Sequence, residues 1–438
     1  MNVVERSVER WRGEFAAVRS GLDTADAIGL DEPDDALLDA FARAMLGLVT
    51  EPGDGVMGRA IASIGALRMA EVLVARRSAD HLSEIVTQTG DALDAREAAK
   101  GLDRWLPRLD QAAFARALAQ AARVGARFLV PGDRGWPRAL DELGVHAPIG
   151  LWVRGRVGAL PTSARSIALV GARAATGYGE HVAGDASAGL VDRGFTIVSG
   201  GAYGIDGMSH RAALASDGTT VALLAGGVDR FYPLGHESLL SRIVETGAVV
   251  SELPCGSAPT KWRFLQRNRL IAAVSDATVV LEAGLRSGSL NTANHAATLG
   301  RPLGAVPGPV TSPASAGCHR LLREFDAVCV VDAEQMAELA GVGPVRRGSG
   351  AEAGGAGDGS ERGSVRSAGD GDGEAAGDAA PEVVRVLDAL STRSPRLIAD
   401  VARRAGMSVP EVMGVLGPLE LNGVALRHSE GWLRRRSR

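Results

Sequence analysis

The chain has 438 residues, of which 45% are hydrophobic and 23% are charged, and its formal net charge is −4. This length allows two or three globular domains, and the slightly acidic balance excludes a nucleic-acid interface that depends on overall charge. The apolar runs are too short to span a membrane, and the N-terminus lacks the basic-then-apolar layout of a secretory signal, which predicts a cytoplasmic protein with no membrane partner.

A helical domain is predicted for residues 1–130. The segments at 35–49 and 110–125 place apolar residues at helical spacing, and the sequence EPGDG at 51–55 interrupts this pattern as a loop. A loop-rich lead-in segment follows at 131–165 and contains a short predicted strand, LWVRG, at 151–155.

An α/β domain is predicted for residues 131–340, including the lead-in segment. Helix-length segments separate most of its short apolar runs, and this alternation indicates a doubly wound, mostly parallel sheet. The runs predicted as strands are SIALVG, TIVSGG, TVALLAGG, AVVSELP, ATVVLEAG and PLGAVPG.

The C-terminal part of the sequence divides into a linker and a small domain. Residues 341–380 consist mainly of Gly, Ala, Asp and Ser, a composition with little to bury that predicts a disordered linker. Residues 381–438 contain two helical segments, a third helix with a capping box at Ser408 and Glu411, and a hairpin pattern. Three helices followed by a hairpin predict a winged helix.

Glycine-rich turns follow four of the predicted strands. Loops after parallel strands emerge at the same edge of the sheet, glycine lets the backbone approach a ligand, and a helix N-terminus favours an anion. The four turns together therefore predict one long phosphate-binding crevice, although each glycine alone also fits a tight turn. The residues concerned are Gly171 and Arg173 in the first turn, Ser199, Gly200, Gly201, Ala202 and Gly204 in the second, Gly226 and Gly227 in the third, and Ser287, Gly288 and Ser289 in the fourth.

A basic cluster, KWRFLQRNR, occupies residues 261–269. Cations interleaved with aromatic residues suit a phosphate backbone with stacked bases. The alternative is a solvated helix face, but the neighbouring glycine turns favour a binding function. Arg173 and Arg286 lie in two of those turns and extend the predicted positive surface.

Several cofactor and catalytic sites are excluded. The first two turns lack the GxGxxG pattern and the acidic residue of a dinucleotide site, and the only lysines, Lys100 and Lys261, are not followed by Ser or Thr as a P-loop requires. The three cysteines lack CxxC spacing. We expect no cofactor, no metal and no catalytic residue; Asp206 and His210 are expected to rigidify the second turn.

These motifs resemble the DNA-processing protein A family, DprA/Smf. The stretches that carry the resemblance are VGARAATGYG, SGGAYGIDGMSHRAAL, LLAGGVDRFYP, SELPCG, FLQRNRLIAAVSDATVVLEAGLRSGSLNTANHA and GRPLGAVPGP, in order over 166–332. The resemblance implies a Rossmann-like domain that binds single-stranded DNA, protects incoming strands and helps load a RecA-type recombinase in natural transformation. It also implies a homodimer.

The resemblance further implies roles for individual residues. The DNA contacts that it indicates are Arg173 in the first turn, Ser199, Gly200, Ala202 and Gly204 in the second, Lys261, the segment Arg267, Asn268 and Arg269, and Ser287, Gly288 and Ser289 in the fourth. Three positions depart from the family pattern: Ala172 replaces a common Ser, Tyr203 a basic or small residue, and Asn291 an aliphatic residue.

Two other functions remain open from the sequence. The same superfamily resembles nucleotide hydrolases of the phosphoribohydrolase type, which carry a glutamate in the loop that corresponds to the fourth turn. No glutamate follows Thr292 in this chain, and Glu282 is the nearby carboxylate. A pure interaction protein is the second alternative.

The third helix of the predicted winged helix carries Glu411 and Glu420 and little positive charge, which favours a protein partner over a DNA groove.

Overall fold

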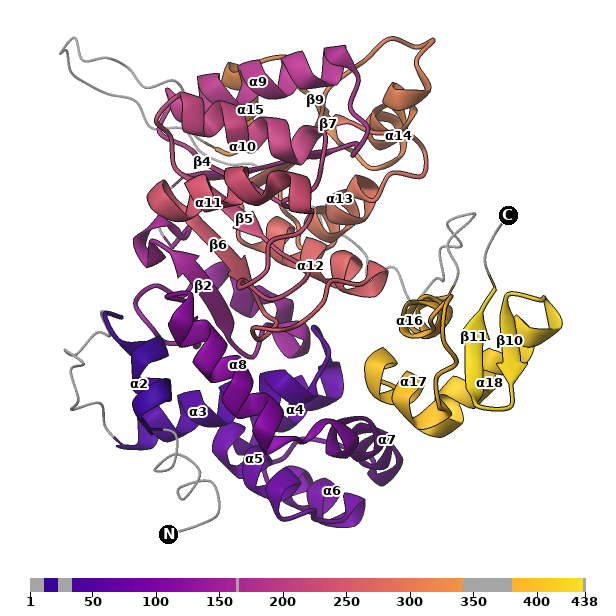
Figure 1. The fold of residues 1–438 in the computed structure, drawn as a ribbon. Coiled ribbons are helices and arrows are strands. Elements are labelled where there is room, and N and C mark those ends of the chain that lie inside the picture. The colour runs from indigo at the N-terminus through magenta and orange to yellow at the C-terminus, as the bar shows by residue number, and fades with distance from the viewer. Residues whose placement is uncertain (1–11, 23–33, 163–164, 342–379, 436–438) are drawn as a thin grey trace.

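A computed structural model describes residues 12–22, 34–162, 165–341 and 380–435. Figure 1 shows an N-terminal group of helices, a central sheet covered by helices on both faces, and a small C-terminal domain beside helix α12. The sequence segment predicted to be a linker lies almost entirely outside the described residues. The α/β fold with a winged helix is thus confirmed.

The N-terminal group consists of helices that pack around one hydrophobic core. Phe41 is central to this core, with edge-to-face contacts to Phe15 and Phe114 at 5.2 Å between ring centroids. Asp54 and Asp110 cap the helices that follow them. The helices are α2 (Arg12–Arg19), α3 (Asp34–Val49), α4 (Gly55–Ile64), α5 (Ala66–Val74), α6 (Ala79–Thr87), α7 (Ala95–Trp105), η1 (Leu106–Arg108) and α8 (Gln111–Arg123).

The central sheet has nine strands in the order β1-β2-β6-β5-β4-β3-β7-β8-β9. All neighbours are parallel except the pairs β1–β2 and β2–β6. The six strands predicted in the α/β domain and the strand LWVRG are confirmed. The strands are β1 (Arg127–Leu129), β2 (Leu151–Gly155), β3 (Ser166–Gly171), β4 (Thr196–Ser199), β5 (Thr220–Leu223), β6 (Ala248–Ser251), β7 (Ala277–Glu282), β8 (Leu303–Ala305) and β9 (Val328–Cys329).

Helices bury the apolar side chains of both sheet faces, as expected for a parallel sheet. One face is covered by α9 (Gly177–Val191), α10 (Ile205–Ala215), α11 (Glu237–Thr246) and α15 (Ala333–Leu339). The other is covered by α12 (Lys261–Ala273), α13 (Ser289–Thr298) and α14 (Ala316–Glu324). Short 3-10 helices η2 (Arg138–His146), η3 (Val157–Ala159), η4 (Leu234–His236) and η5 (Pro313–Ser315) complete the domain.

The core of the helical domain continues into the sheet. Phe128 of β1 and Trp152 of β2 pack with their rings tilted by 43°, at 4.7 Å between ring centroids. Both belong to the hydrophobic cluster that includes Phe41 and the buried side of α11. The two antiparallel strands therefore connect the helical domain to the parallel part of the sheet through one shared core.

The C-terminal domain is a three-helix unit with a hairpin, as the sequence predicts. Its elements are α16 (Pro381–Ala389), α17 (Ile398–Ala405), α18 (Val409–Leu421), β10 (Ala425–His428) and β11 (Gly431–Arg434). The predicted capping box is present, because Ser408 accepts from the Glu411 backbone N–H while Glu411 accepts from the Ser408 N–H. The domain buries its own hydrophobic cluster.

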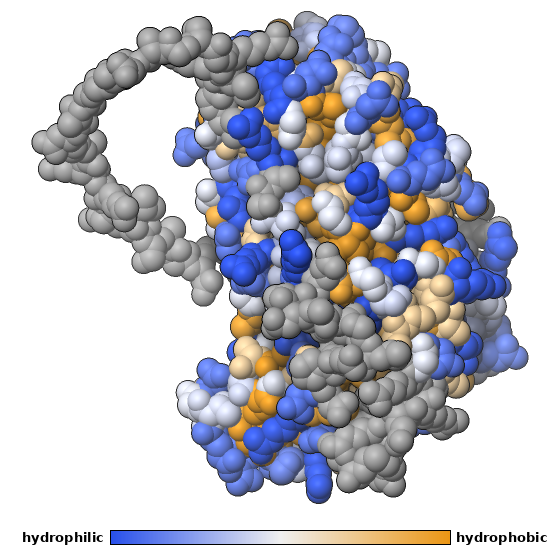
Figure 2. Space-filling view, turned by 90° about the vertical axis from the view of Figure 1, so that its left-hand side faces the viewer, coloured by the Kyte–Doolittle hydropathy of each residue, from blue (hydrophilic) through white to orange (hydrophobic). Residues whose placement is uncertain are grey.

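Within the described residues, none of the helices has the length and apolar character needed to cross a membrane. The face of the molecule in Figure 2 mixes hydrophilic and hydrophobic residues.

Candidate nucleic-acid interface

The strand order reverses direction at β3. From β3, the chain proceeds to β4, β5 and β6 on one side, and later to β7, β8 and β9 on the other. The loops after β3, β4 and β7 therefore leave the sheet next to one another at its carboxyl edge, which is the usual ligand position in such folds. The glycine turns found in the sequence occupy this point.

The glycines of the first two turns bring the loops into direct contact. Gly204 has a φ of +75°, and a Cβ at this position would collide with the backbone oxygen of Ala172. The backbone N–H of Ile205, the first residue of α10, donates to the same oxygen at 3.1 Å. A side chain at Gly171 would likewise overlap Ile205 and the Glu282 backbone. Close loop packing thus explains these two glycines.

Several hydrogen-bond donors of the first two turns already have partners inside the protein. The Ala172 N–H donates to the Glu282 backbone oxygen at 2.7 Å, and the Ala202 N–H to Asp206 at 3.3 Å. The Ser199 hydroxyl is buried and donates to the Leu169 oxygen at 2.6 Å. The buried residues Gly200 and Gly201 and the half-buried residues Ala202 and Gly204 therefore shape the second turn from within.

The fourth turn is more open. Gly288 is exposed and Ser287 is half-buried, whereas Ser289 is buried at the first position of α13. The Ser287 and Ser289 hydroxyl oxygens lie 2.7 Å apart and share a hydrogen bond. Leu285, Arg286 and Gly288 are the exposed residues of this turn, and Ser287 is partly accessible.

Arg267 is buried beneath the second turn. Its guanidinium donates to the Leu223 backbone oxygen and, together with Asp206, flanks Gly200 so closely that a Cβ on this glycine would overlap both side chains. Burial lowers the pKa of Arg267 to about 10, against the effect of Asp206, so the side chain keeps its charge at neutral pH. Arg267 was predicted as a DNA contact, but it is only 6% exposed.

The next two residues of the predicted contact segment are also buried. Asn268 donates through Nδ2 to the Gly288 backbone oxygen at 3.3 Å and to Asn291 Oδ1 at 3.2 Å. Arg269 is 3% exposed, and its two terminal nitrogens each donate to the Glu252 carboxylate at 2.6 Å. The sequence suggests one continuous basic surface, whereas these side chains connect α12 to its neighbours.

Arg263, in the first half of α12, pairs with the helical domain. Its guanidinium donates to both Glu51 carboxylate oxygens, at 2.9 and 2.8 Å, and Arg108 adds a bond of 2.7 Å to the same carboxylate. Burial alone would raise the pKa of Glu51, but Arg263 and Arg108 outweigh it and lower the pKa to about 2. This junction holds the helical domain against α12.

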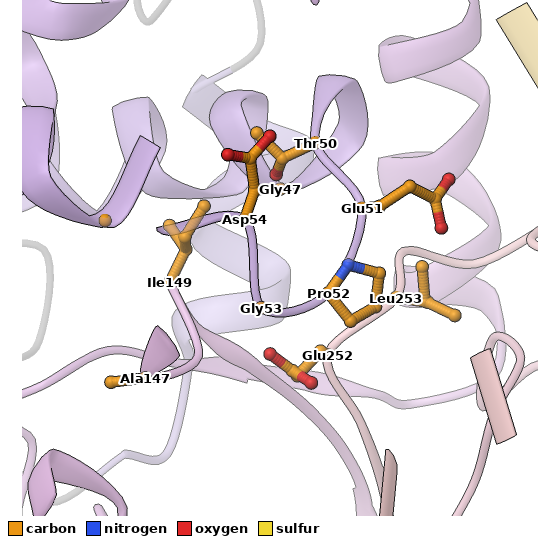
Figure 3. A pocket seen from close by; sticks show the side chains of 11 residues that line it. Gly47, Thr50, Glu51, Pro52, Gly53, Asp54, Ala147, Ile149, Glu252 and Leu253 are labelled. Atoms are coloured by element: carbon orange, nitrogen blue, oxygen red, sulfur yellow. The ribbon is translucent and has the colours of Figure 1, made fainter. Parts of the chain in front are cut away.

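The junction borders a recess between the helical domain and the sheet. Figure 3 shows the loop from Thr50 to Asp54 at its wall, with the Glu51 and Asp54 side chains leaving the loop in different directions and Glu252 on the opposite side. Asp54 accepts from Arg104 and from the Trp105 indole N–H at 3.1 and 2.9 Å. The three carboxylates therefore all have arginine partners.

Of the cations predicted for the positive surface, Arg173, Lys261 and Arg286 are exposed. The Arg173 guanidinium carbon lies 4.8 Å from the centre of the Phe264 ring, and that of Arg267 lies 5.7 Å from it. Tyr232 contacts the same ring at 5.8 Å between centroids. Lys261 and Phe264 are three residues apart in α12 and thus lie on one side of its first turn.

All three tyrosines of the chain lie half-exposed after strands at this edge. Tyr178 is in the first turn of α9, Tyr203 is in the turn after β4, and Tyr232 follows the turn after β5. Their exposed fractions are 39%, 48% and 50%. Tyr203 also packs edge-on against His236 at 4.7 Å between centroids. Sequence reasoning missed this grouping, although the scarcity of tyrosine was a usable signal.

The groups considered for catalysis have structural partners. His210 is buried against the Thr220 hydroxyl at 2.7 Å, and burial lowers its pKa to about 3. Glu282 is buried and accepts from the Thr176 backbone N–H at 2.8 Å and from the Thr176 hydroxyl at 2.6 Å. Within the part of the chain that the structure describes, no cluster of three potential metal ligands occurs.

Comparisons with known proteins agree with this architecture. The family model described as DNA recombination-mediator protein A matches residues 127–341, and that of the DprA winged helix domain matches residues 373–431. A DNA processing protein DprA of Mycobacterium tuberculosis is 44% identical over 321 residues, which cover 71% of this chain and 77% of that protein. DprA of Bacillus subtilis is 32% identical over 238 residues, which cover 54% and 78%, respectively.

A solved structure provides the same result. The X-ray structure of DNA processing protein A from Streptococcus pneumoniae is 26% identical, covers 68% of this chain and 97% of that one, and superposes with a TM-score of 0.54. The extent and identity of these matches, over a domain whose glycine turns had suggested the same relationship, show that this chain belongs to the DNA recombination-mediator protein A (DprA/Smf) family.

Proposed function

We propose that this protein binds single-stranded DNA at the carboxyl edge of its sheet and acts as a recombination mediator rather than as an enzyme. The observation that carries the proposal is the contact of Phe264 with Arg173 and Tyr232, which brings an exposed cation and two aromatic rings together from three different segments. Tyr232 is exposed and Phe264 is partly buried. Aromatic rings beside cations suit a flexible strand whose bases are unpaired, because each base offers a face for stacking.

The proposed division of labour follows from exposure. Arg173 and Lys261 are exposed and hold phosphates, together with Ser287 and Gly288 of the fourth turn. Phe264 and Tyr232 receive bases by stacking, which gives no sequence preference. Arg267 acts from beneath by supporting Phe264 and the second turn. Arg269 and Asn268 fix the position of α12 and act indirectly.

The wider role is proposed from family membership. The protein protects incoming single strands and helps load a RecA-type recombinase during natural transformation, a role that belongs in the cytoplasm. A homodimer would place two such sites on one strand, and the second contact would then form at a high effective concentration.

A nucleotide hydrolase of the phosphoribohydrolase type is less well supported. Such a reaction needs a carboxylate near the glycosidic bond, and Glu282 is the only candidate that the sequence offers near the fourth turn. Its carboxylate already accepts two hydrogen bonds from Thr176 and is 2% exposed. Glu282 is better suited to hold the first turn, and with it Arg173, in place.

The test compares binding of a fluorescent oligo-dT with binding of a matched duplex by anisotropy. The proposal predicts preference for the single strand and loss of binding in an Arg173→Ala/Lys261→Ala variant. Release of free base or phosphate from nucleotides, together with no preference for the single strand, would support the hydrolase instead.

A further inference from the structure

The winged helix contacts the same helix that carries Lys261 and Phe264. The backbone N–H of Trp262, in the first turn of α12, donates to the Asp388 carboxylate of α16 at 3.1 Å. The first N–H groups of a helix have no partner within the helix, and they favour an anion. A carboxylate from the C-terminal domain thus occupies a position suited to a phosphate, beside an exposed lysine.

A second contact joins α16 to Trp262. Arg385 lies one turn before Asp388, and its guanidinium carbon is 5.6 Å from the centre of the Trp262 ring. Arg385 is oriented by hydrogen bonds to the backbone oxygens of Ala405 and Gly406. At the start of α12, Arg385 therefore contacts the ring of Trp262 and Asp388 contacts its backbone N–H.

The helical domain completes this contact. Gly406, at the end of α17, lies so close to Glu51 and Arg108 that a Cβ there would contact both side chains. Glu51 also pairs with Arg263 of α12. The Glu51 carboxylate thus lies where the helical domain, α12 and the winged helix meet, and the contact between these parts depends largely on charged groups.

Two features of the contact between the winged helix and α12 favour its separation. The winged helix keeps a hydrophobic cluster of its own, separate from the clusters of the other domains, so it does not need α12 to complete its core. The indole nitrogen of Trp262 is buried with no hydrogen-bond partner among the residues that the structure describes, which makes the closed contact less favourable than a fully paired one.

We propose that the winged helix is an intramolecular competitor of single-stranded DNA, in which Asp388 holds the start of α12 until a phosphate of the strand displaces it. This inference rests on the proposed function, because it requires Lys261 and Phe264 to lie on the path of the strand. In the closed form, the negative charge of Asp388 repels a strand at this point. Binding then releases α16 and frees the winged helix.

The test uses the full-length chain and anisotropy with oligo-dT. Asp388→Asn removes the competing charge and is expected to tighten binding three- to tenfold. The matched control, Glu382→Gln, removes one exposed charge from the same helix and is expected to change binding less than twofold. Thermal melting verifies folding, and Asp388→Ala replaces Asp388→Asn if the latter is destabilised.

The outcomes separate this inference from the proposed function. Wild-type binding that Lys261→Ala weakens, with Asp388→Asn no tighter than Glu382→Gln, overturns the competition and leaves the DNA site in place. Absence of oligo-dT binding by every form, Asp388→Asn included, overturns the proposed function and the competition together. Tighter binding by Asp388→Asn that Lys261→Ala reverses in the double variant supports both.

Discussion

The guanidinium of Arg173 lies over the ring of Phe264, with 4.8 Å between the guanidinium carbon and the ring centre. Arg173 belongs to the turn after β3, and Phe264 belongs to the first half of α12. A strand that reaches this point encounters a cation and an aromatic face together. We therefore expect a base to stack on the Phe264 ring and a phosphate to pair with the Arg173 guanidinium.

The Phe264 ring is expected to contribute to single-strand binding through stacking. Phe264→Ala should weaken oligo-dT binding by about 1–3 kcal/mol, the usual range for loss of one base–aromatic stack. Phe264→Tyr retains a ring and serves as the control. Anisotropy at constant salt measures the effect, and equal affinity of Phe264→Ala and the wild type would exclude a stacking role for this ring.

The Arg269–Glu252 pair is expected to matter for stability. Arg269→Ala leaves the Glu252 carboxylate, whose side chain is 9% exposed, without its two 2.6 Å bonds. Breaking a buried pair in this way costs about 3–5 kcal/mol. Urea unfolding measures the loss.

The double variant Arg269→Ala/Glu252→Ala provides the control for this pair. Because the two groups interact directly, the double variant should lose less stability than the sum of the two single variants. Strict additivity would show that the two side chains act independently, which would contradict the pairing.

Glu51 predicts a dependence of stability on acid. Its pKa is about 2 in the folded protein against 4.5 for the free side chain, so the unfolded chain takes up the proton first as the pH falls. The stabilisation is fully present above about pH 4.5 and is lost as the pH falls toward 2. It amounts to roughly 3 kcal/mol at neutral pH.

Urea unfolding between pH 3 and pH 6 tests this prediction. The wild type should lose stability steadily below pH 4.5, and Glu51→Gln should be less stable at pH 6 but show a shallower decline. The same decline in both proteins would assign the acid sensitivity to other groups.

The sequence predicted the parts of the fold that depend on local pattern. The strands of the parallel sheet, the capping box at Ser408 and the hairpin all follow from periodicity and short-range residue preferences. The short strands β1 and β9 were not predicted, because three and two residues carry too little pattern. The strand LWVRG was predicted, but its antiparallel pairing with β6 depends on the tertiary fold.

The basic cluster illustrates what a local pattern leaves out. The sequence KWRFLQRNR suggests one positive face, but Arg263 pairs with Glu51, 212 residues away, and Arg269 with Glu252. The carboxylates that neutralise these arginines lie in loops with no local mark of their role. Lys261 is the exposed cation of the cluster, and Phe264 is the ring that reaches Arg173.

The most direct measurement is a salt titration of oligo-dT binding by the wild type and by the Arg173→Ala and Lys261→Ala variants. If both cations hold phosphates, affinity falls linearly with salt on logarithmic axes, and each substitution weakens binding and reduces the slope by about 1 for every sequence. Unchanged slopes in both variants, with affinity equal to that of the wild type, would contradict a DNA site at this edge of the sheet.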